Sequence, residues 1–205
     1  RYELTNRSDR PRSLTLALMA RPYQVNGPVQ FLAIPGGVAP VETLKWEAGQ
    51  LSLDATQVRP LSAPNSVAMN RFDQGSDPQS LILPATRRPA DQTQSLSDTT
   101  NLPAAALVYE VTLQPGETRQ FGFVSPLSGN LTTTATLADL DKAEQALSQQ
   151  WRTTLDKVDL ILPPPAQRIE DALKSSLAHM LMSRQGPILQ PGTRSYNRSW
   201  IRDGA

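Results

Sequence analysis

The residues of this chain whose types and spacing best suit chemistry lie close together at positions 194–205. Tyr196 and Trp200 supply flat aromatic faces, which can cover the apolar side of a pyranose ring. Three arginines and Asp203 supply charged groups, whose hydrogen bonds to sugar hydroxyls are stronger than those of neutral groups. Aromatic and charged side chains in this combination are what a sugar-binding subsite requires. The segment 194–205 is therefore a candidate sugar-binding segment.

The same residues also have a structural interpretation. An adjacent Arg and Asp at the start of a helix can form a cap and an exposed ion pair, which contributes about 0–1 kcal/mol and binds nothing. Trp200 can pack in a core at a domain junction, because a tryptophan buries a large area in either role. The residue types alone leave these alternatives open.

The composition disfavours several classes of protein. The 205 residues carry a formal net charge of +1, whereas nucleic-acid and membrane-surface proteins usually show a concentrated basic patch. The absence of Cys excludes disulfides and thiolate metal sites. The single histidine, His179, lies at the margin of a predicted helix stripe, where packing is favoured over catalysis. We expect no metal or other cofactor, no nucleic-acid partner and no membrane partner.

The elements that would position the terminal segment begin with short strands. Period-two alternation and turn-forming residues predict three hairpins, which pair segments 2–5 with 13–19, 41–46 with 51–54, and 104–113 with 120–124. Gly49 lies in the turn of the second hairpin, where a positive φ is needed. Weaker strand signals occur at 29–34, 67–72 and 81–83. Many short strands with regular turn signals predict an antiparallel β-sandwich over residues 1–128.

The segment 84–103 is polar and contains Arg87 and Arg88 among many Gln, Ser, Thr and Asp residues. It predicts a long loop, and loops of that length in a compact domain are either functional or disordered. A disordered surface excursion is the favoured interpretation.

Helical periodicity begins at Thr136, where Thr136 and Asp139 form an N-cap pattern, and predicts a helix to about Asp156. An extended crossing stopped by three prolines at 163–165 leads to a second predicted helix, 165–184. This second helix cannot bury its apolar stripe alone. We therefore expect a linker with a helix at 129–163, and at 164–205 the first segment of a helical domain in a longer protein.

This order of elements, the linker from Trp151 to Pro165 and the segment from Tyr196 to Asp203 together resemble the front part of bacterial six-hairpin glycosidases of the glucoamylase-like group. The resemblance implies a mainly β chain: a β super-sandwich, a linker helix and the first helix of an incomplete (α/α)6 barrel. In that group a Trp-x-Arg-Asp segment follows the first barrel helix, and its Arg and Asp bind the sugar. The match assigns Arg202 and Asp203 to a sugar subsite and Trp200 to its lining, with Tyr196 as a weaker match.

The resemblance implies a function for the whole protein and no catalytic residue in this chain. Glycoside hydrolysis needs two carboxyl groups flanking the bond. In the group these are Glu residues much later in the barrel, and no Glu of this chain matches them. We expect an accessory sandwich and the beginning of the catalytic barrel of a glycoside hydrolase, inactive by itself, whose partners are an oligosaccharide or glycan and the rest of the barrel.

Two other functions stay open. The chain can be a non-catalytic β-sandwich module that binds a carbohydrate or a protein, with its helices as an interaction arm. The long polar segment 84–103 motivates this alternative. Alternatively, a disaccharide phosphorylase can share the sandwich and barrel. A periplasmic or secreted location is slightly favoured over a cytoplasmic one.

Overall fold

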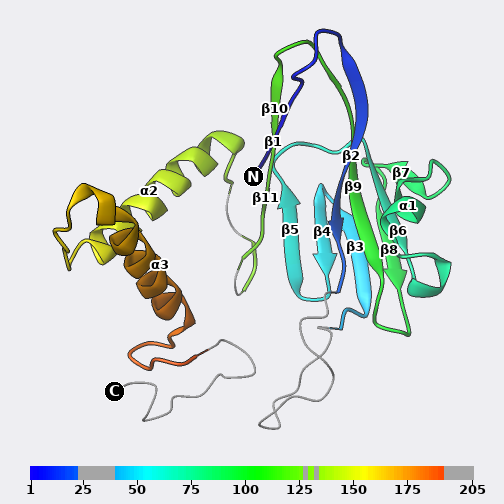
Figure 1. Cartoon of the computed structure of the whole chain (residues 1–205). Helices are drawn as coiled ribbons and strands as arrows, with labels where there is room; N and C mark the ends of the chain where they lie inside the picture. Colours follow the sequence, from blue (N-terminus) through cyan, green and yellow to red (C-terminus); the bar gives the residue numbers. More distant parts are fainter. Residues whose placement is uncertain (23–39, 127–128, 132–133, 192–205) are drawn as a thin grey trace. The chain divides into compact units, whose positions relative to one another are not determined.

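The computed structural model describes residues 1–22, 40–126, 129–131 and 134–191. This part of the chain has three antiparallel sheets followed by two long helices, a mixed and mostly β arrangement (Figure 1). The prediction of antiparallel sheets followed by helices is confirmed at this level. The chain divides into two compact units, Arg1–Tyr23 with Ala39–Leu140, and Gln24–Val38 with Asp141–Ala205. The sheets belong to the first unit.

The strands of the first unit pair antiparallel throughout. One sheet has the order β11-β5-β4-β3-β8, a second has the order β2-β9-β6-β7, and β1 pairs with β10. The strands are β1 Tyr2–Thr5, β2 Arg12–Ala20, β3 Thr43–Glu47, β4 Gln50–Leu53, β5 Thr56–Pro60, β6 Ser66–Asn70, β7 Arg87–Pro89, β8 Gln94–Ser97, β9 Ala104–Leu113, β10 Thr118–Phe121 and β11 Phe123–Val124.

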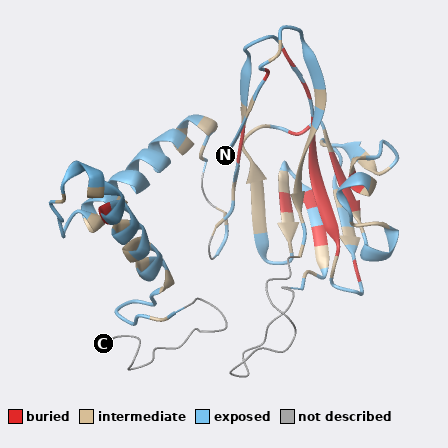
Figure 2. Cartoon of the chain, in the orientation of Figure 1, coloured by how far each residue is buried: buried red, intermediate tan, exposed pale blue. Residues whose placement is uncertain are grey.

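The two larger sheets share one hydrophobic core, most of which Figure 2 shows as buried segments along their strands. Leu44 and Trp46 of β3 enter it from the five-stranded sheet, and Leu107 and Tyr109 of β9 enter it from the four-stranded sheet. Phe121 of β10 lies against Tyr109 with the ring centroids 5.0 Å apart in an edge-to-face arrangement. Strands from all three sheets therefore contribute to one core, which alternation along each strand makes possible.

The predicted hairpins are confirmed in one case and wrong in two. Ala48 and Gly49 have φ of 49° and 75°, and they join β3 to β4 in the predicted tight turn. The other strands form but pair elsewhere: β1 with β10, β2 with β9, and β11 with β5. Alternation identifies a strand and its inner face, but it does not identify the partner strand, which the shared core selects.

Two predicted strands, at 67–72 and 81–83, differ from the structure. The strand expected at 81–83 is wrong, because residues Pro78–Ile82 form helix α1. The carboxylate of Asp77 accepts hydrogen bonds from the Gln79 and Ser80 amides at 2.9 and 3.0 Å, and Pro78 occupies the first turn. An Asp-Pro cap outweighed a short apolar run. The strand expected at 67–72 ends at Asn70 and leads into the 3₁₀ helix η2, Phe72–Gln74; the strand expected at 29–34 lies outside the described residues.

The prediction of a long loop over 84–103 is wrong. Residues 87–89 form β7 at the edge of the four-stranded sheet, and residues 94–97 form β8 at the edge of the five-stranded sheet. Edge strands have one unpaired side and tolerate Pro and polar residues, so their composition resembles that of a loop. Pro89, at the end of β7, is an instance.

The two predicted helices are confirmed. Helix α2 spans Leu137–Leu155, and the Asp139 carboxylate accepts hydrogen bonds from the amide and hydroxyl of Thr136 at 2.9 and 2.8 Å. The 3₁₀ helix η3, Pro164–Ala166, precedes α3, Gln167–Ser183. Neither long helix in the described part of the chain has the length and apolar character needed to cross a bilayer.

In the second unit, an ion pair network joins α3 to the end of α2. The ammonium group of Lys174 lies 2.9 Å from the carboxylates of both Asp156 and Glu170. Hydrogen bonds from Lys174 and Gln167 lower the pKa of Glu170.

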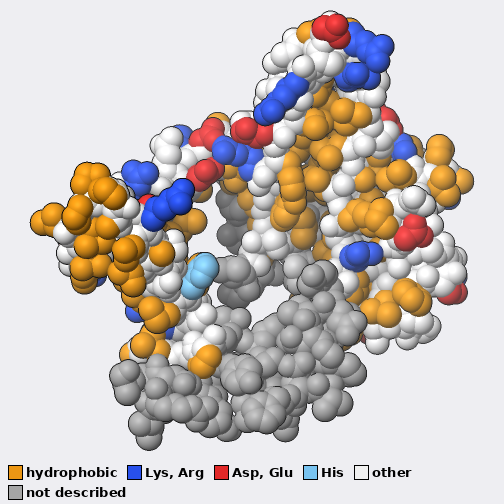
Figure 3. All heavy atoms as spheres, viewed as in Figure 1, with side chains coloured by type: hydrophobic (Ala, Val, Ile, Leu, Met, Phe, Trp, Pro, Cys, Tyr) orange, Lys and Arg blue, Asp and Glu red, His pale blue; other side chains and the backbone are white. Residues whose placement is uncertain are grey.

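The apolar stripe of α3 is largely exposed, with Ile169, Leu173 and Met180 each at least half accessible to solvent. Figure 3 shows hydrophobic side chains gathered on the surface of the helical segment.

Candidate functional site

The four predicted sugar-binding residues, Tyr196, Trp200, Arg202 and Asp203, lie outside the described residues. The last described residue is Pro191. It follows a short bridge in which Gln185 and Ile188 exchange backbone hydrogen bonds of 2.9 and 3.1 Å. Met180, Leu189, Gln190 and Pro191 line a cavity of about 340 Å³ next to this bridge. The sugar subsite therefore stays a prediction from the sequence.

A polar pocket that sequence reasoning did not place lies in the first unit. Its volume is about 570 Å³. It is built where β7 and β8, the edge strands of the two larger sheets, come near the end of β6 and η2. The lining residues are Met69, Asn70, Gln74, Ala85, Thr86, Arg88, Thr93, Gln94, Ser95 and Leu96. Seven of these ten residues, from Ala85 to Leu96, belong to the segment that was expected to be a loop.

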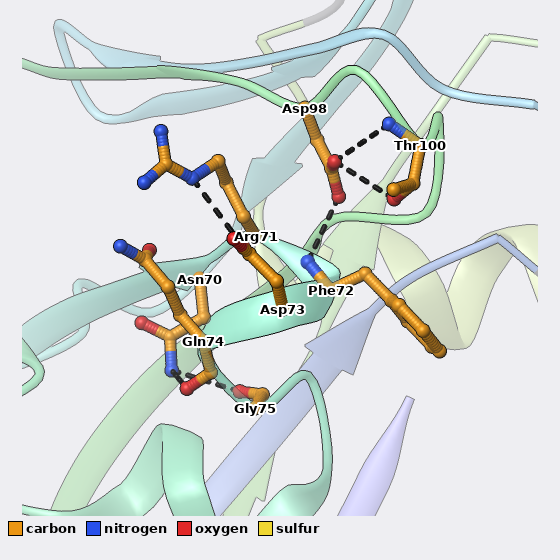
Figure 4. A network of polar contacts seen from close by, with 8 residues as sticks. All are labelled: Asn70, Arg71, Phe72, Asp73, Gln74, Gly75, Asp98 and Thr100. Atoms are coloured by element: carbon orange, nitrogen blue, oxygen red, sulfur yellow. Dashed lines mark hydrogen bonds and ion pairs between the residues drawn. The ribbon is translucent and has the colours of Figure 1, made fainter.

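Asp98, which follows β8 directly, ties the two sides of the pocket together. One carboxylate oxygen accepts a hydrogen bond of 2.8 Å from the amide of Phe72, the first residue of η2 (Figure 4). The other accepts from the amide and the hydroxyl of Thr100, both at 2.8 Å. The residue is only 2% exposed. Because β8 forms one wall of the pocket and η2 the other, this carboxylate connects the two walls.

The ionisation of Asp98 follows from these contacts. Burial raises the pKa of the carboxyl group, but hydrogen bonds from the Phe72 amide and from the amide and hydroxyl of Thr100 outweigh burial, together with one from the Leu102 amide. The net result is a pKa below the ordinary value, so Asp98 is charged at neutral pH. The hydrogen bonds to this carboxylate come from other residues of the first unit.

Asn70 stiffens the η2 wall of the pocket. Its amide nitrogen donates to the carbonyls of Gln74 and Gly75, at 3.4 and 2.8 Å (Figure 4). Arg71 pairs with Asp73 at 3.5 Å in the same turn. The Phe72 ring points away from the Asn70 and Gln74 side chains in Figure 4 and is 54% exposed. Asn70 and Gln74 therefore line the pocket, whereas the ring of Phe72 points away from their side chains.

The opposite wall presents one cation and several neutral polar groups. The guanidinium of Arg88 donates through one nitrogen, Nη1, to the carbonyls of Ala85 and Arg87 at 3.1 and 3.2 Å. Gln94 donates a long hydrogen bond of 3.5 Å to the Val67 carbonyl. Within the described part of the chain, the hydroxyls of Thr93 and Ser95 have no hydrogen-bond partner. The adjacent Arg87 faces differently, binding Glu110 and the Ile82 carbonyl.

The described residues contain no group of three or more His, Asp or Glu side chains placed to hold a metal ion. His179, on α3, is exposed. The only hint of the polar pocket in the sequence was the dense polar composition around Arg87 and Arg88.

Comparisons of the chain with protein-family models, with curated proteins and with solved structures find no match.

Proposed function

We propose that this chain is the N-terminal β super-sandwich and the beginning of the helical catalytic domain of a carbohydrate-active glycoside hydrolase. The observation that carries the proposal is the segment Trp200-Ile201-Arg202-Asp203, which follows helix α3 in the sequence. Arg202 and Asp203 form part of a sugar subsite, with Trp200 and Tyr196 lining it. The carboxyl groups that cleave the bond come from elsewhere in the protein.

Two features of the described residues support this proposal. The two larger antiparallel sheets share one core, as the layers of a sandwich do. In addition, α3 leaves Ile169, Leu173 and Met180 exposed along one stripe. A helix with such a stripe suits packing against further helices, which is the environment of the first helix in an (α/α)6 barrel.

The test is an activity assay of the full-length product of the gene on α-glucosides and related oligosaccharides, with and without phosphate. We expect hydrolysis that needs no phosphate. We expect Asp203→Ala to lower kcat/KM by about tenfold or more, because a hydrogen bond to a charged group is worth about 1.5–3 kcal/mol. Ser199→Ala, a change in the same segment, serves as the matched control and retains activity.

Three outcomes contradict the proposal in different ways. Full activity of Asp203→Ala removes the site assignment while leaving the hydrolase in place. Turnover that depends on phosphate replaces the hydrolase with a phosphorylase. No turnover of any glycoside removes the proposed activity itself.

A further inference from the structure

We propose that the polar pocket between the edges of β7 and β8 binds a hydroxylated ligand that carries one carboxylate, with the chemistry of a uronic acid. The site is separate in sequence from the terminal Trp-x-Arg-Asp segment. The proposal rests on the geometry of the first unit and does not depend on the glycosidase activity proposed above.

The size and the rigidity of the pocket suit a small ligand. Its volume of about 570 Å³ falls within the range of about 300–1,000 Å³ typical of small-molecule sites. Asp98 fixes the β8 wall to η2 through the Phe72 amide, and Asn70 fixes the η2 turn internally. Walls held in this way before binding reduce the entropy lost when a ligand is ordered.

The neutral polar groups of the pocket match hydroxyls, which both donate and accept. Asn70 and Gln94 use their amide nitrogens on backbone carbonyls, which leaves their amide oxygens as acceptors. Thr93 and Ser95 have hydroxyls without a partner among the residues described, and these groups can donate or accept. Met69 and Leu96 add apolar surface that can contact the C–H groups of a sugar ring.

The charge of the pocket selects for an acidic ligand. Among the described residues that line the pocket, Arg88 is the one charged residue and none carries a carboxylate. Arg88 forms no ion pair with any described residue, and its hydrogen bonds to Ala85 and Arg87 use only the nitrogen Nη1. The remaining guanidinium nitrogens can donate to a carboxylate, for which arginine geometry is well suited. Arg71, the nearby cation, is already paired with Asp73.

The proposal is tested by nuclear magnetic resonance titration of the ¹⁵N-labelled 205-residue chain with methyl β-D-glucuronide and, separately, methyl β-D-glucopyranoside. We expect saturable shifts with the glucuronide, concentrated on the amides of Asn70, Thr86, Arg88, Gln94 and Ser95. We expect the neutral glucoside to bind about tenfold more weakly, because it lacks the charge-assisted hydrogen bond.

Two variants identify the source of the selectivity. Arg88→Gln is expected to bring the affinities for the two glycosides to within about twofold, since it removes the charge and keeps a polar side chain. Arg10→Gln, which changes an exposed arginine in the turn between β1 and β2, is the control and should leave both affinities unchanged. Unchanged resonances of the core amides, such as that of Leu107, show that Arg88→Gln is folded.

The proposal is overturned if neither glycoside gives saturable shifts, or if the shifts fall outside the pocket. Equal binding of the two glycosides by the unaltered chain overturns the assignment of an acidic ligand. Retention of the preference by folded Arg88→Gln does the same, because the charge would then act from another site.

Discussion

The buried carboxylate of Asp98 shows how one residue can determine the shape of a binding surface without lining it. Its contacts with the amides of Phe72 and Thr100 join the end of β8 to η2. Both hydrogen bonds go to a carboxylate, and hydrogen bonds to charged groups contribute more than neutral ones. The shape of the pocket therefore depends on a charge that the ligand never meets.

The ionisation of Asp98 makes the stability of the first unit sensitive to acid. Its pKa is lowered in the folded chain, so its contribution is present above the ordinary pKa of about 4 and is lost as the pH falls through the folded value. We expect Asp98→Asn to be less stable than the unaltered chain at pH 7, with the difference shrinking by pH 3. Urea unfolding at the two pH values measures this difference.

Asp9→Asn is the control for the acid sensitivity of Asp98. Asp9 is exposed, and its carboxylate has no hydrogen bond to any described residue. This variant should match the unaltered chain at both pH values. A stability difference for Asp98→Asn that stays constant between pH 7 and pH 3 would show that the charge of Asp98 contributes nothing.

At the scale of elements, the first turn of α2, which belongs to the first unit, packs closely against a glycine of that unit. A Cβ atom at Gly122 would lie 2.8 Å from Cδ1 of Leu140 and 3.2 Å from Cδ2 of Leu137. Gly122 lies between β10 and β11, and both leucines belong to the first turn of α2. The missing side chain therefore allows the helix to begin against the sheet.

We expect Gly122→Ala to lower the free energy of unfolding by about 1 kcal/mol. Overpacking costs about 1–3 kcal/mol, and reduced freedom of the unfolded chain offsets part of this cost. Thermal or urea unfolding measures the change. The double variant Gly122→Ala/Leu140→Ala provides the control, because removal of the Leu140 side chain relieves the overlap. Additive effects of the two substitutions would contradict the proposed contact.

The edge strands β7 and β8 show that an edge strand is hard to predict from composition. Both lie in a segment whose polar residues and prolines predict a loop, yet each adds to a different sheet. An edge strand buries little, so alternation of apolar residues is weak there. Arg88 and Gln94 line the same pocket because β7 and β8 each join the edge of one of the two larger sheets.

At the scale of the whole first unit, the larger hydrophobic core joins strands that are far apart in the sequence. Phe121 is fully buried in this core against Tyr109, although its strand, β10, has β1 as its one partner among the described strands. We expect Phe121→Ala to lower the free energy of unfolding by about 3–5 kcal/mol, as for other buried phenylalanines. Urea unfolding followed by tryptophan fluorescence measures the effect.

Phe123→Ala is the matched control, since Phe123 lies two residues further on, is 41% exposed and contacts the ring of Tyr2. It should cost less than about 1 kcal/mol. Equal losses for the two variants would mean that Phe121 is not part of the common core.

The sequence alone determined the local elements with strong periodicity. Leu107 to Leu113 alternate on one face, and the strand β9 forms there as predicted. Thr136 and Asp139 mark the start of α2, and Ala48-Gly49 forms the predicted turn. These features depend on neighbours within a few residues, so the physical cause is contained in the local sequence.

The tertiary structure decided which strands pair and which polar residues meet. Tyr2 lies opposite Phe121, and Arg12 lies opposite Leu113, because burial of a common core selects partners that local alternation does not distinguish. The same selection brings Arg88 and Gln94 to Asn70 and Gln74, with Asp98 between the walls. The residue types of this pocket were visible in the sequence, but their convergence is a product of long-range packing.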